Sequence, residues 1–199
     1  MVAAASTMLP LGTRAPYFNL PDTEGNTVSP DDFKDAPALL VIFMCNHCPF
    51  VKHVHEGMLK LIREYQARGA GVVAINSNDL LEYPEDGPEM MAQQAREYGY
   101  TFPYVFDETQ EVAIAFQAAC TPDFYVFDRD RRLVYRGQMD NSRPGNNRPV
   151  TGSDLRAALD AVLEGRPVSP IQKPSIGCNI KWKAGTEPSY YQGELVMAR

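Results

Sequence analysis

Hydrophobic positions along the chain predict a β-α-β unit near its start. The run Ala38–Met44 has no polar alternation, which is typical of a parallel strand covered on both faces. Apolar residues then recur at intervals of three and four, Gly69 ends that pattern, and Val72–Ile75 predicts a second buried strand. The helical positions are Val51, Val54, Met58, Leu61, Ile62 and Tyr65. We expect a right-handed crossover between the two parallel strands.

The remaining pattern predicts an α/β domain over residues 1–165, with a central mixed sheet flanked by helices. Turn-rich residues 21–26 between two short apolar segments predict an N-terminal β-hairpin, and residues 77–90 form an excursion. A helix is expected over 89–98, residues 104–106 either extend the sheet or precede a short helix over 109–119, and segments 124–127 and 133–135 predict an antiparallel hairpin. Ser153 and Gly165 are the expected cap and stop of a last helix.

Residues 166–199 form an irregular C-terminal arm. Four prolines preclude a long helix, and no clear strand replaces it. Because the arm also holds Trp182 and other apolar residues, we expect it to dock on the domain.

Charge and composition exclude several classes of protein. Hydrophobic residues make up 44% of the 199 residues, and the formal net charge is -6. This charge argues against nucleic acid or an anionic membrane as a partner. No stretch approaches the roughly 18 apolar residues of a membrane-spanning helix, and the N-terminus lacks the basic region of a signal peptide. With only four cysteines, the chain is expected to be cytoplasmic and to use its CxxC for catalysis.

The candidate chemistry lies at the end of the first buried strand, in Cys45-Asn46-His47-Cys48. Two thiols at a strand-to-helix turn can close a small disulfide ring, and the helix N-terminus stabilises a thiolate. The thiolate is the attacking species in disulfide exchange. The motif therefore predicts a redox pair with Cys45 and Cys48 as catalytic residues.

Thr121-Pro122, just before the strand over 124–127, adds a second signal. Together with the strand–CxxC–helix order, it makes residues 9–165 resemble the thioredoxin superfamily. The hairpin and the segment Thr121–Asp128 resemble its AhpC/TSA-type redoxin branch, and the arm around Ser175–Trp182 is similar to that of bacterial thioredoxin-family proteins of unassigned substrate.

The resemblance implies a thiol–disulfide oxidoreductase without a cofactor. Cys45 would be the exposed attacking thiol and Cys48 the more buried resolving thiol. Thr121 and a cis Pro122 would form the loop that receives substrate backbone. The implied partners are a disulfide-containing protein or a small thiol, together with a recycling redox partner.

Asn46 and His47 are the expected tuning residues. Thioredoxin has Gly-Pro between its cysteines, whereas the strong oxidant DsbA has Pro-His. A cationic or hydrogen-bonding His47 would stabilise the reduced thiolate, so we expect a potential less negative than that of thioredoxin.

Three alternatives remain open. A peroxiredoxin-like thiol peroxidase would carry Thr or Ser three residues before its reactive cysteine and Pro seven before. Those positions hold Ile42 and Ala38 before Cys45, and Cys45 and Val41 before Cys48. A zinc half-site would need two more suitably spaced ligands, and a copper-type site would use the cysteines with a histidine. The first expectation is that the cysteines bind no metal ion.

Two cysteines and the proton acceptor remain unassigned. Cys120 and Cys178 are either buried free thiols or a second redox pair, with Cys178 reaching Cys120 or the CxxC. The positions that carry an acid in thioredoxin and some relatives hold Leu39 and Val51 here. Asp123 is the remaining candidate base, although a surface or capping role is the first expectation for it.

Overall fold

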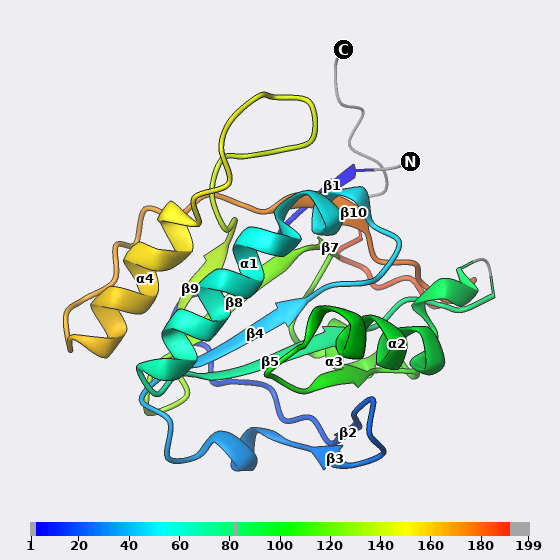
Figure 1. Ribbon diagram of the computed structural model, residues 1–199, viewed down its shortest axis with the longest axis horizontal. Coiled ribbons are helices and arrows are strands. Elements are labelled where there is room, and N and C mark those ends of the chain that lie inside the picture. The colour runs from blue at the N-terminus through cyan, green and yellow to red at the C-terminus, as the bar shows by residue number, and fades with distance from the viewer. Residues whose placement is uncertain (1–2, 82, 192–199) are drawn as a thin grey trace.

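The protein is built around a five-stranded mixed sheet (Figure 1). The computed structural model describes residues 3–81 and 83–191. The strand order is β6-β5-β4-β8-β9, in which β4 pairs with β5 in parallel and with β8 in antiparallel orientation. The strands are β4 Leu39–Phe43, β5 Gly71–Asn76, β6 Tyr104–Phe106, β8 Asp123–Phe127 and β9 Leu133–Gly137. The predicted β-α-β unit and the predicted hairpin are both confirmed.

Helices cover one face of the sheet more fully than the other. Residues of α1, α2 and α4 share one hydrophobic core with the sheet, whereas α3 and the N-terminal segment share a second core on the opposite face. The helices are α1 Pro49–Ala67, α2 Pro88–Tyr98, α3 Glu111–Ala115 and α4 Ser153–Leu163, with short 3-10 helices η1 Pro30–Phe33 and η2 Pro84–Asp86. A small hairpin of β2 Leu20–Pro21 and β3 Thr27–Val28 closes the second face.

Strand β4 is buried on both faces, as its unbroken apolar run predicts. Leu40 and Ile42 belong to the core under α1, whereas Leu39, Val41 and Phe43 belong to the opposite core. Because successive side chains of a strand point to opposite faces, a strand between two helical layers needs apolar residues at every position. This burial fixes the position of the residues that follow β4.

Helix α1 buries every position that the spacing assigned to its apolar face. The helix lies across the sheet and ends before Gly69, whose φ of 93° suits only a residue without a side chain. In α4, by contrast, Ser153 is the first helical residue and Gly152 is the cap, so the predicted capping role of Ser153 is wrong.

A second, three-stranded sheet joins distant parts of the chain. Its order is β1-β10-β7, from β1 Ala3–Ala5, β10 Ile176–Asn179 and β7 Cys120–Thr121. Sequence reasoning expected no clear strand in the arm, and β10 shows that this expectation is wrong; it made no prediction for the segment that forms β1. The arm's last residues, 192–199, lie outside the described part of the chain.

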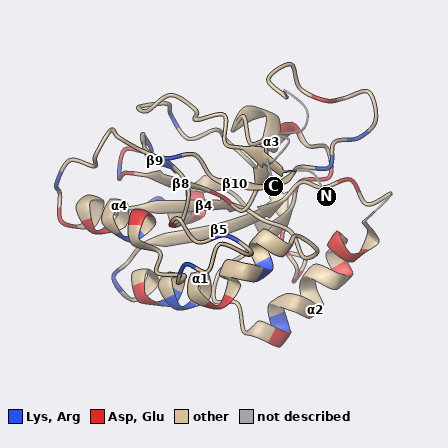
Figure 2. Cartoon of the chain, turned by 90° about the horizontal axis from the view of Figure 1, so that it is seen from above, with Lys and Arg blue, Asp and Glu red and all other residues tan. Residues whose placement is uncertain are grey.

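Most charged side chains lie outside the main sheet, and Asp123 in β8 and Arg136 in β9 are the exceptions in its strands. Figure 2 shows charged residues on the outward turns of α1 and α2 and on loops, and β4 and β5 contain none. Within the part of the chain that the structure describes, no helix has the length and apolar character needed to cross a membrane.

Candidate functional site

The Cys45–Cys48 segment turns the chain from β4 into α1. Cys48 is the residue that precedes the helix, with extended backbone, and Pro49 occupies the first helical position. Proline suits this position because the backbone N–H there has no partner within the helix. Both Cys45 and Cys48 are fully buried, so the expectation of an exposed Cys45 is wrong for this conformation.

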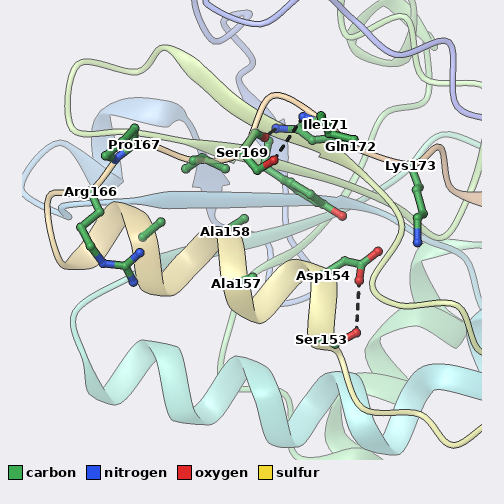
Figure 3. Close-up of a pocket in the computed structure, with 13 residues that line it drawn as sticks. Ser153, Asp154, Ala157, Ala158, Arg166, Pro167, Ser169, Ile171, Gln172 and Lys173 are labelled. Atoms are coloured by element: carbon green, nitrogen blue, oxygen red, sulfur yellow. Dashed lines mark hydrogen bonds between the residues drawn. The ribbon is translucent and has the colours of Figure 1, made fainter.

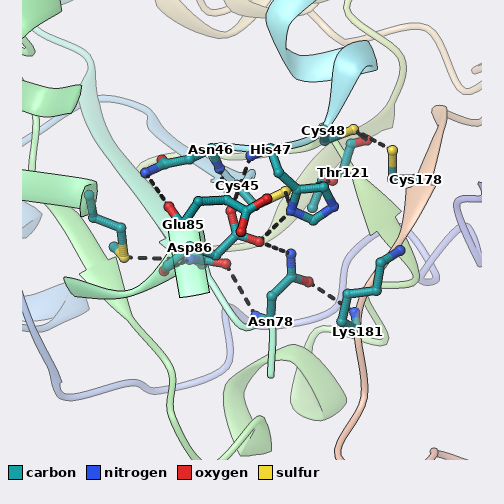
Figure 4. Close-up of polar contacts among 12 residues, drawn as sticks. Cys45, Asn46, His47, Cys48, Asn78, Glu85, Asp86, Thr121, Cys178 and Lys181 are labelled. Carbon is teal, nitrogen blue, oxygen red and sulfur yellow. Dashed lines mark hydrogen bonds and ion pairs between the residues drawn. The ribbon is translucent and has the colours of Figure 1, made fainter. Parts of the chain in front are cut away.

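Cys45 is buried because the excursion after β5 folds over the turn (Figure 4). Asp86, fully buried in η2, accepts hydrogen bonds from the backbone N–H groups of Asn46 (2.8 Å) and His47 (3.1 Å). The Asn46 side chain donates to the carbonyl of Glu85 (3.0 Å). These bonds join the excursion to the segment between the two cysteines.

His47 lies between Asp86 and the Cys45 sulfur. Its Nδ1 is 2.5 Å from Oδ2 of Asp86 and 3.7 Å from Sγ of Cys45. The imidazole ring stacks on Tyr83, with ring centroids 4.2 Å apart. Asn78 donates a further hydrogen bond to Oδ2 of Asp86 (2.8 Å). The buried carboxylate therefore orients His47 toward Cys45.

Sequence reasoning missed Asp86 and Tyr83. Both lie in the Pro- and Gly-containing excursion, which was read only as a connection. The available signal was the acidic pair Glu85-Asp86 directly before a helix, but nothing local indicated that the segment turns back to β4.

The predicted proline loop faces both thiols. The Thr121–Pro122 peptide bond is cis, as the resemblance implied. Oγ1 of Thr121 is 3.6 Å from the Cys45 sulfur, and the Cys48 thiol donates to the Thr121 carbonyl (3.2 Å). The structure thus brings the tuning residues and both cysteines of the CxxC together at one end of β4.

The two thiols have opposite tendencies to ionise. Burial raises the pKa of Cys45 well above its usual range, and the hydrogen bond with Cys48 and the charge of Asp86 raise it further. Burial also disfavours the Cys48 thiolate, but hydrogen bonds from Cys178 and Cys45 and from the Val51 backbone outweigh it and lower the pKa of Cys48. In the described conformation, in which Cys45 is buried, Cys48 is therefore the thiol that ionises more readily.

Cys120 and Cys178 do not face each other. In the β7–β10 ladder, Cys178 lies opposite Thr121 and Asn179 lies opposite Cys120. Neighbouring residues of a strand point to opposite faces, so the two thiols lie on opposite sides of the small sheet. The predicted Cys120–Cys178 pair is therefore wrong, whereas Cys178 reaches the CxxC: its Sγ is 2.7 Å from Sγ of Cys48.

Asp123 is a buried residue of β8, and the expected surface or capping role is wrong. Its carboxylate accepts hydrogen bonds from the Ser6 hydroxyl, the Tyr125 hydroxyl (2.9 Å) and the Phe124 N–H (3.2 Å). Burial raises its pKa to about 7, although these hydrogen bonds act in the opposite direction. Such a group can exchange protons near neutral pH.

Three groups at this site have the chemistry of metal ligands. Sγ of Cys45, a ring nitrogen of His47 and a carboxylate oxygen of Asp86 all lie within 4.8 Å of one another. Thiolate and imidazole suit zinc or copper. In the described structure, however, His47 and Asp86 already pair with each other.

Two hollows differ in their relation to the thiols. One of about 410 Å³ lies between α4 and arm residues 166–173, contains no cysteine and is shown in Figure 3. Another of about 250 Å³ is lined by Leu81, Trp182, Lys181 and the Tyr83 ring that stacks on His47. The second hollow therefore borders Tyr83, which belongs to the segment that folds over Cys45.

The mixed sheet, with a strand-to-helix turn facing a cis-proline loop, defines a thioredoxin-like fold. It aligns with the thioredoxin domain of a thiol-disulfide oxidoreductase from Bacteroides vulgatus at a TM-score of 0.56, with 20% identity over 75% of this chain and 99% of that one. The chain belongs to the Redoxin family, whose model matches residues 10–159. The predicted membership of the thioredoxin superfamily is thereby confirmed.

The names of individual relatives refer to two related activities. The chain is 28% identical over 124 residues to the thiol-disulfide oxidoreductase ResA of Halalkalibacterium halodurans, covering 62% of this chain and 65% of that relative. A Mycobacterium tuberculosis protein with a provisional peroxiredoxin name is also 28% identical, over 65% of this chain and 85% of its own. A crystal structure of an uncharacterised conserved protein from Geobacillus kaustophilus is much more similar, with a TM-score of 0.90 and 59% identity over 92% of this chain and 98% of that chain.

Proposed function

We propose that the protein is a thiol–disulfide oxidoreductase that uses Cys45 and Cys48. The observation that carries the proposal is the position of Thr121, which contacts the Cys45 sulfur through its hydroxyl and the Cys48 sulfur through its carbonyl. The cis-proline loop therefore lies against both thiols, while the backbone of Thr121 pairs with Cys178 of β10. This arrangement holds Cys45 and Cys48 next to one loop, as a dithiol pair that opens and closes a disulfide requires.

In the proposed reaction, the Cys45 thiolate attacks one sulfur of a substrate disulfide and releases the other sulfur as a thiolate. Cys48 then attacks Cys45 in the mixed disulfide, which frees the reduced substrate and forms the Cys45–Cys48 disulfide. Each turnover moves two electrons from the protein to the substrate. A recycling dithiol is needed to return them.

Cys45 has to become accessible for the first step. The cover consists of Tyr83 and η2, and hydrogen bonds of Asp86 and Glu85 hold it to Asn46 and His47. Opening this cover would hydrate Cys45 and remove the burial that raises the pKa of its thiol. A substrate that fills the hollow beside Tyr83 is positioned to displace the cover.

Disulfide-containing proteins or small disulfides are the proposed substrates, and the cytoplasm is the proposed location. The net charge of -6 supports a protein or small-molecule partner over nucleic acid. Antioxidant action and redox homeostasis follow from the same exchange chemistry.

A thiol peroxidase is the second candidate, favoured by the ionisation of Cys48 at the N-terminus of α1. The reduced protein is treated separately with a protein disulfide and with hydrogen peroxide, and the loss of each thiol is followed by alkylation and mass mapping. Faster loss of Cys45 and Cys48 to the disulfide supports the oxidoreductase. Faster reaction with peroxide, with a sulfenic acid on one cysteine, refutes it in favour of a peroxidase.

Metal binding is a third candidate, favoured by the cluster of Cys45, His47 and Asp86. Metal analysis after gentle purification of the reduced protein tests it. Stoichiometric zinc or copper that is lost in Cys45→Ser would support a metal site, and a metal-free protein that exchanges disulfides would exclude it.

A further inference from the structure

Cys178 comes from the other end of the chain to contact the second cysteine of the CxxC. The Sγ atoms of Cys48 and Cys178 are 2.7 Å apart, and both side chains are fully buried (Figure 4). An S–S bond is about 2.05 Å long, so a small movement brings the two sulfurs to bonding distance. No other thiol in the described structure makes so close a sulfur contact.

The position of Cys178 is fixed by its strand. In the middle of the small sheet, Cys178 pairs with Ala3 of β1 on one side and with Thr121 of β7 on the other. The preceding Gly177 lies so close to this loop that an added Cβ would be 1.9 Å from the Thr121 carbonyl oxygen. Only glycine allows this approach, which places Cys178 against Cys48.

The groups around Cys48 and Cys178 include several that stabilise a thiolate. Cys48 precedes α1, and the backbone N–H groups of Val51 and Phe50 lower the pKa of Cys48 and Cys178 respectively. The hydrogen bond to Cys48 and then burial raise the pKa of Cys178, while the charge of Lys181 lowers it. When Cys48 is part of a disulfide, it cannot ionise and no longer raises the pKa of Cys178. The backbone N–H of Phe50 and the charge of Lys181 then remain to stabilise a Cys178 thiolate.

We propose that Cys178 is a third redox-active cysteine that forms an alternative disulfide with Cys48. This inference rests on the proposed function, which supplies the Cys45–Cys48 disulfide. The Cys178 thiol loses its proton, and its thiolate attacks Sγ of Cys48. The Cys48–Cys178 bond forms, the Cys45–Cys48 bond breaks, and Cys45 leaves as a thiolate that can take up a proton.

This internal exchange conserves electrons and needs no external oxidant. Its product keeps the protein oxidised by two electrons but returns Cys45 as a free thiol beside His47. The disulfide would then lie between the start of α1 and β10, and Cys45, the residue proposed to attack substrate, would be reduced.

The test uses the full-length protein and equimolar 4,4′-dithiodipyridine as the oxidant, followed by alkylation and non-reducing peptide mapping. In Cys45→Ser we expect the loss of two thiols per chain and a linked Cys48–Cys178 peptide within one chain. In the wild-type protein we expect both the Cys45–Cys48 and the Cys48–Cys178 linkages. Three free thiols in oxidised Cys45→Ser, or only links between chains, would overturn the proposal.

Matched variants separate this inference from the proposed function. Cys120→Ser removes a buried thiol from the same sheet and should retain the Cys48–Cys178 linkage, whereas Cys178→Ser should form only Cys45–Cys48. The wild-type map does not depend on any variant folding, and absence of the Cys48–Cys178 peptide there refutes the inference.

The exchange rate with a protein disulfide is read in parallel. If the wild-type protein exchanges but lacks the Cys48–Cys178 linkage, the inference fails and the proposed function stands. If Cys45→Ser forms that linkage but the wild-type protein exchanges with no disulfide, the proposed function fails while the Cys48–Cys178 pair stands.

Discussion

The His47–Asp86 pair yields a quantitative prediction for the reactivity of Cys45. Nδ1 of His47 is 3.7 Å from the Cys45 sulfur, and a carboxylate oxygen of Asp86 lies within 4.8 Å of it. At an effective dielectric constant of about 20, a positive charge on the His47 ring would stabilise the thiolate by about 4.5 kcal/mol, whereas a negative charge on Asp86 would destabilise it by about 3.5 kcal/mol or more. The two charges therefore nearly cancel.

Replacing His47 by alanine removes only the favourable charge. Asp86 keeps the hydrogen bonds that it accepts from the backbone of Asn46, from the backbone of residue 47 and from the Asn78 side chain. We therefore expect His47→Ala to raise the pKa of Cys45 by about three units. In the double variant His47→Ala/Asp86→Asn neither charge remains, and the pKa should return to within about one unit of the wild-type value.

The assay is the rate at which Cys45 is alkylated by iodoacetamide at one fixed pH below its pKa, read by mass mapping; because only the thiolate reacts, a pKa raised by about three units slows alkylation by about 1,000-fold. Thermal melts of each variant, followed by circular dichroism, control for folding. A His47→Ala rate that is unchanged or higher would refute the electrostatic argument. A double variant that behaves like the single one would show that the effect does not come from Asp86.

Three further predictions follow from the packing of the site. Gly177→Ala should lower the free energy of unfolding by about 2 kcal/mol or more, measured by urea unfolding, because its Cβ would clash with the Thr121 carbonyl. Asp123→Asn should remove a pH dependence of the free energy of unfolding. The carboxyl of Asp123 has a pKa of about 7 in the folded protein and about 3.9 in the unfolded chain. Its contribution to stability is therefore fully present below pH 4 and falls by about 4 kcal/mol as the pH rises to 7. Tyr83→Ala should increase the alkylation rate of Cys45 at fixed pH, because the ring that covers His47 is removed.

Each of these predictions has a control. An added Cβ at Gly57 would meet only side-chain atoms, of Val150 and Met139, whereas the Cβ at Gly177 meets backbone, so Gly57→Ala should change stability by less than Gly177→Ala. For Asp123, stability curves of wild type and variant that run parallel between pH 4 and 7 would contradict the assigned pKa. For Tyr83, the alkylation rate of Cys120 serves as the internal reference, and an equal increase at both cysteines would indicate general loosening.

The parts of the fold that sequence patterns predict are those whose pairing is local. The apolar run before Cys45 and the three-and-four spacing after it define β4 and α1 without reference to the rest of the chain. Strands β1 and β10 were missed because each is short and weakly apolar, and each becomes a strand only by pairing with distant segments, β1 with β10 and β10 with both β1 and β7. A strand of three alanines carries no periodicity that could reveal it.

The candidate site shows the same division. Cys45, Cys48 and Thr121 could be named from spacing and resemblance, since they adjoin strand ends. Asp86 could not be named, because its contacts with Asn46 and His47 depend on the fold of the excursion. The sequence left two possible partners for Cys178, Cys120 and the CxxC. Only the register of the β7–β10 ladder, which places Cys120 and Cys178 on opposite faces, distinguishes between them.

The small sheet also has a consequence for the order in which the chain can assemble during synthesis. Strand β1 is made before the strands of the main sheet, and its ladder partner, β10, is made after them. Until β10 emerges from the ribosome, β7 lacks this neighbour and Cys48 stands without Cys178. A nascent chain that has already folded its main sheet therefore carries a dithiol at the helix N-terminus with one side uncovered, and the addition of β10 covers that side.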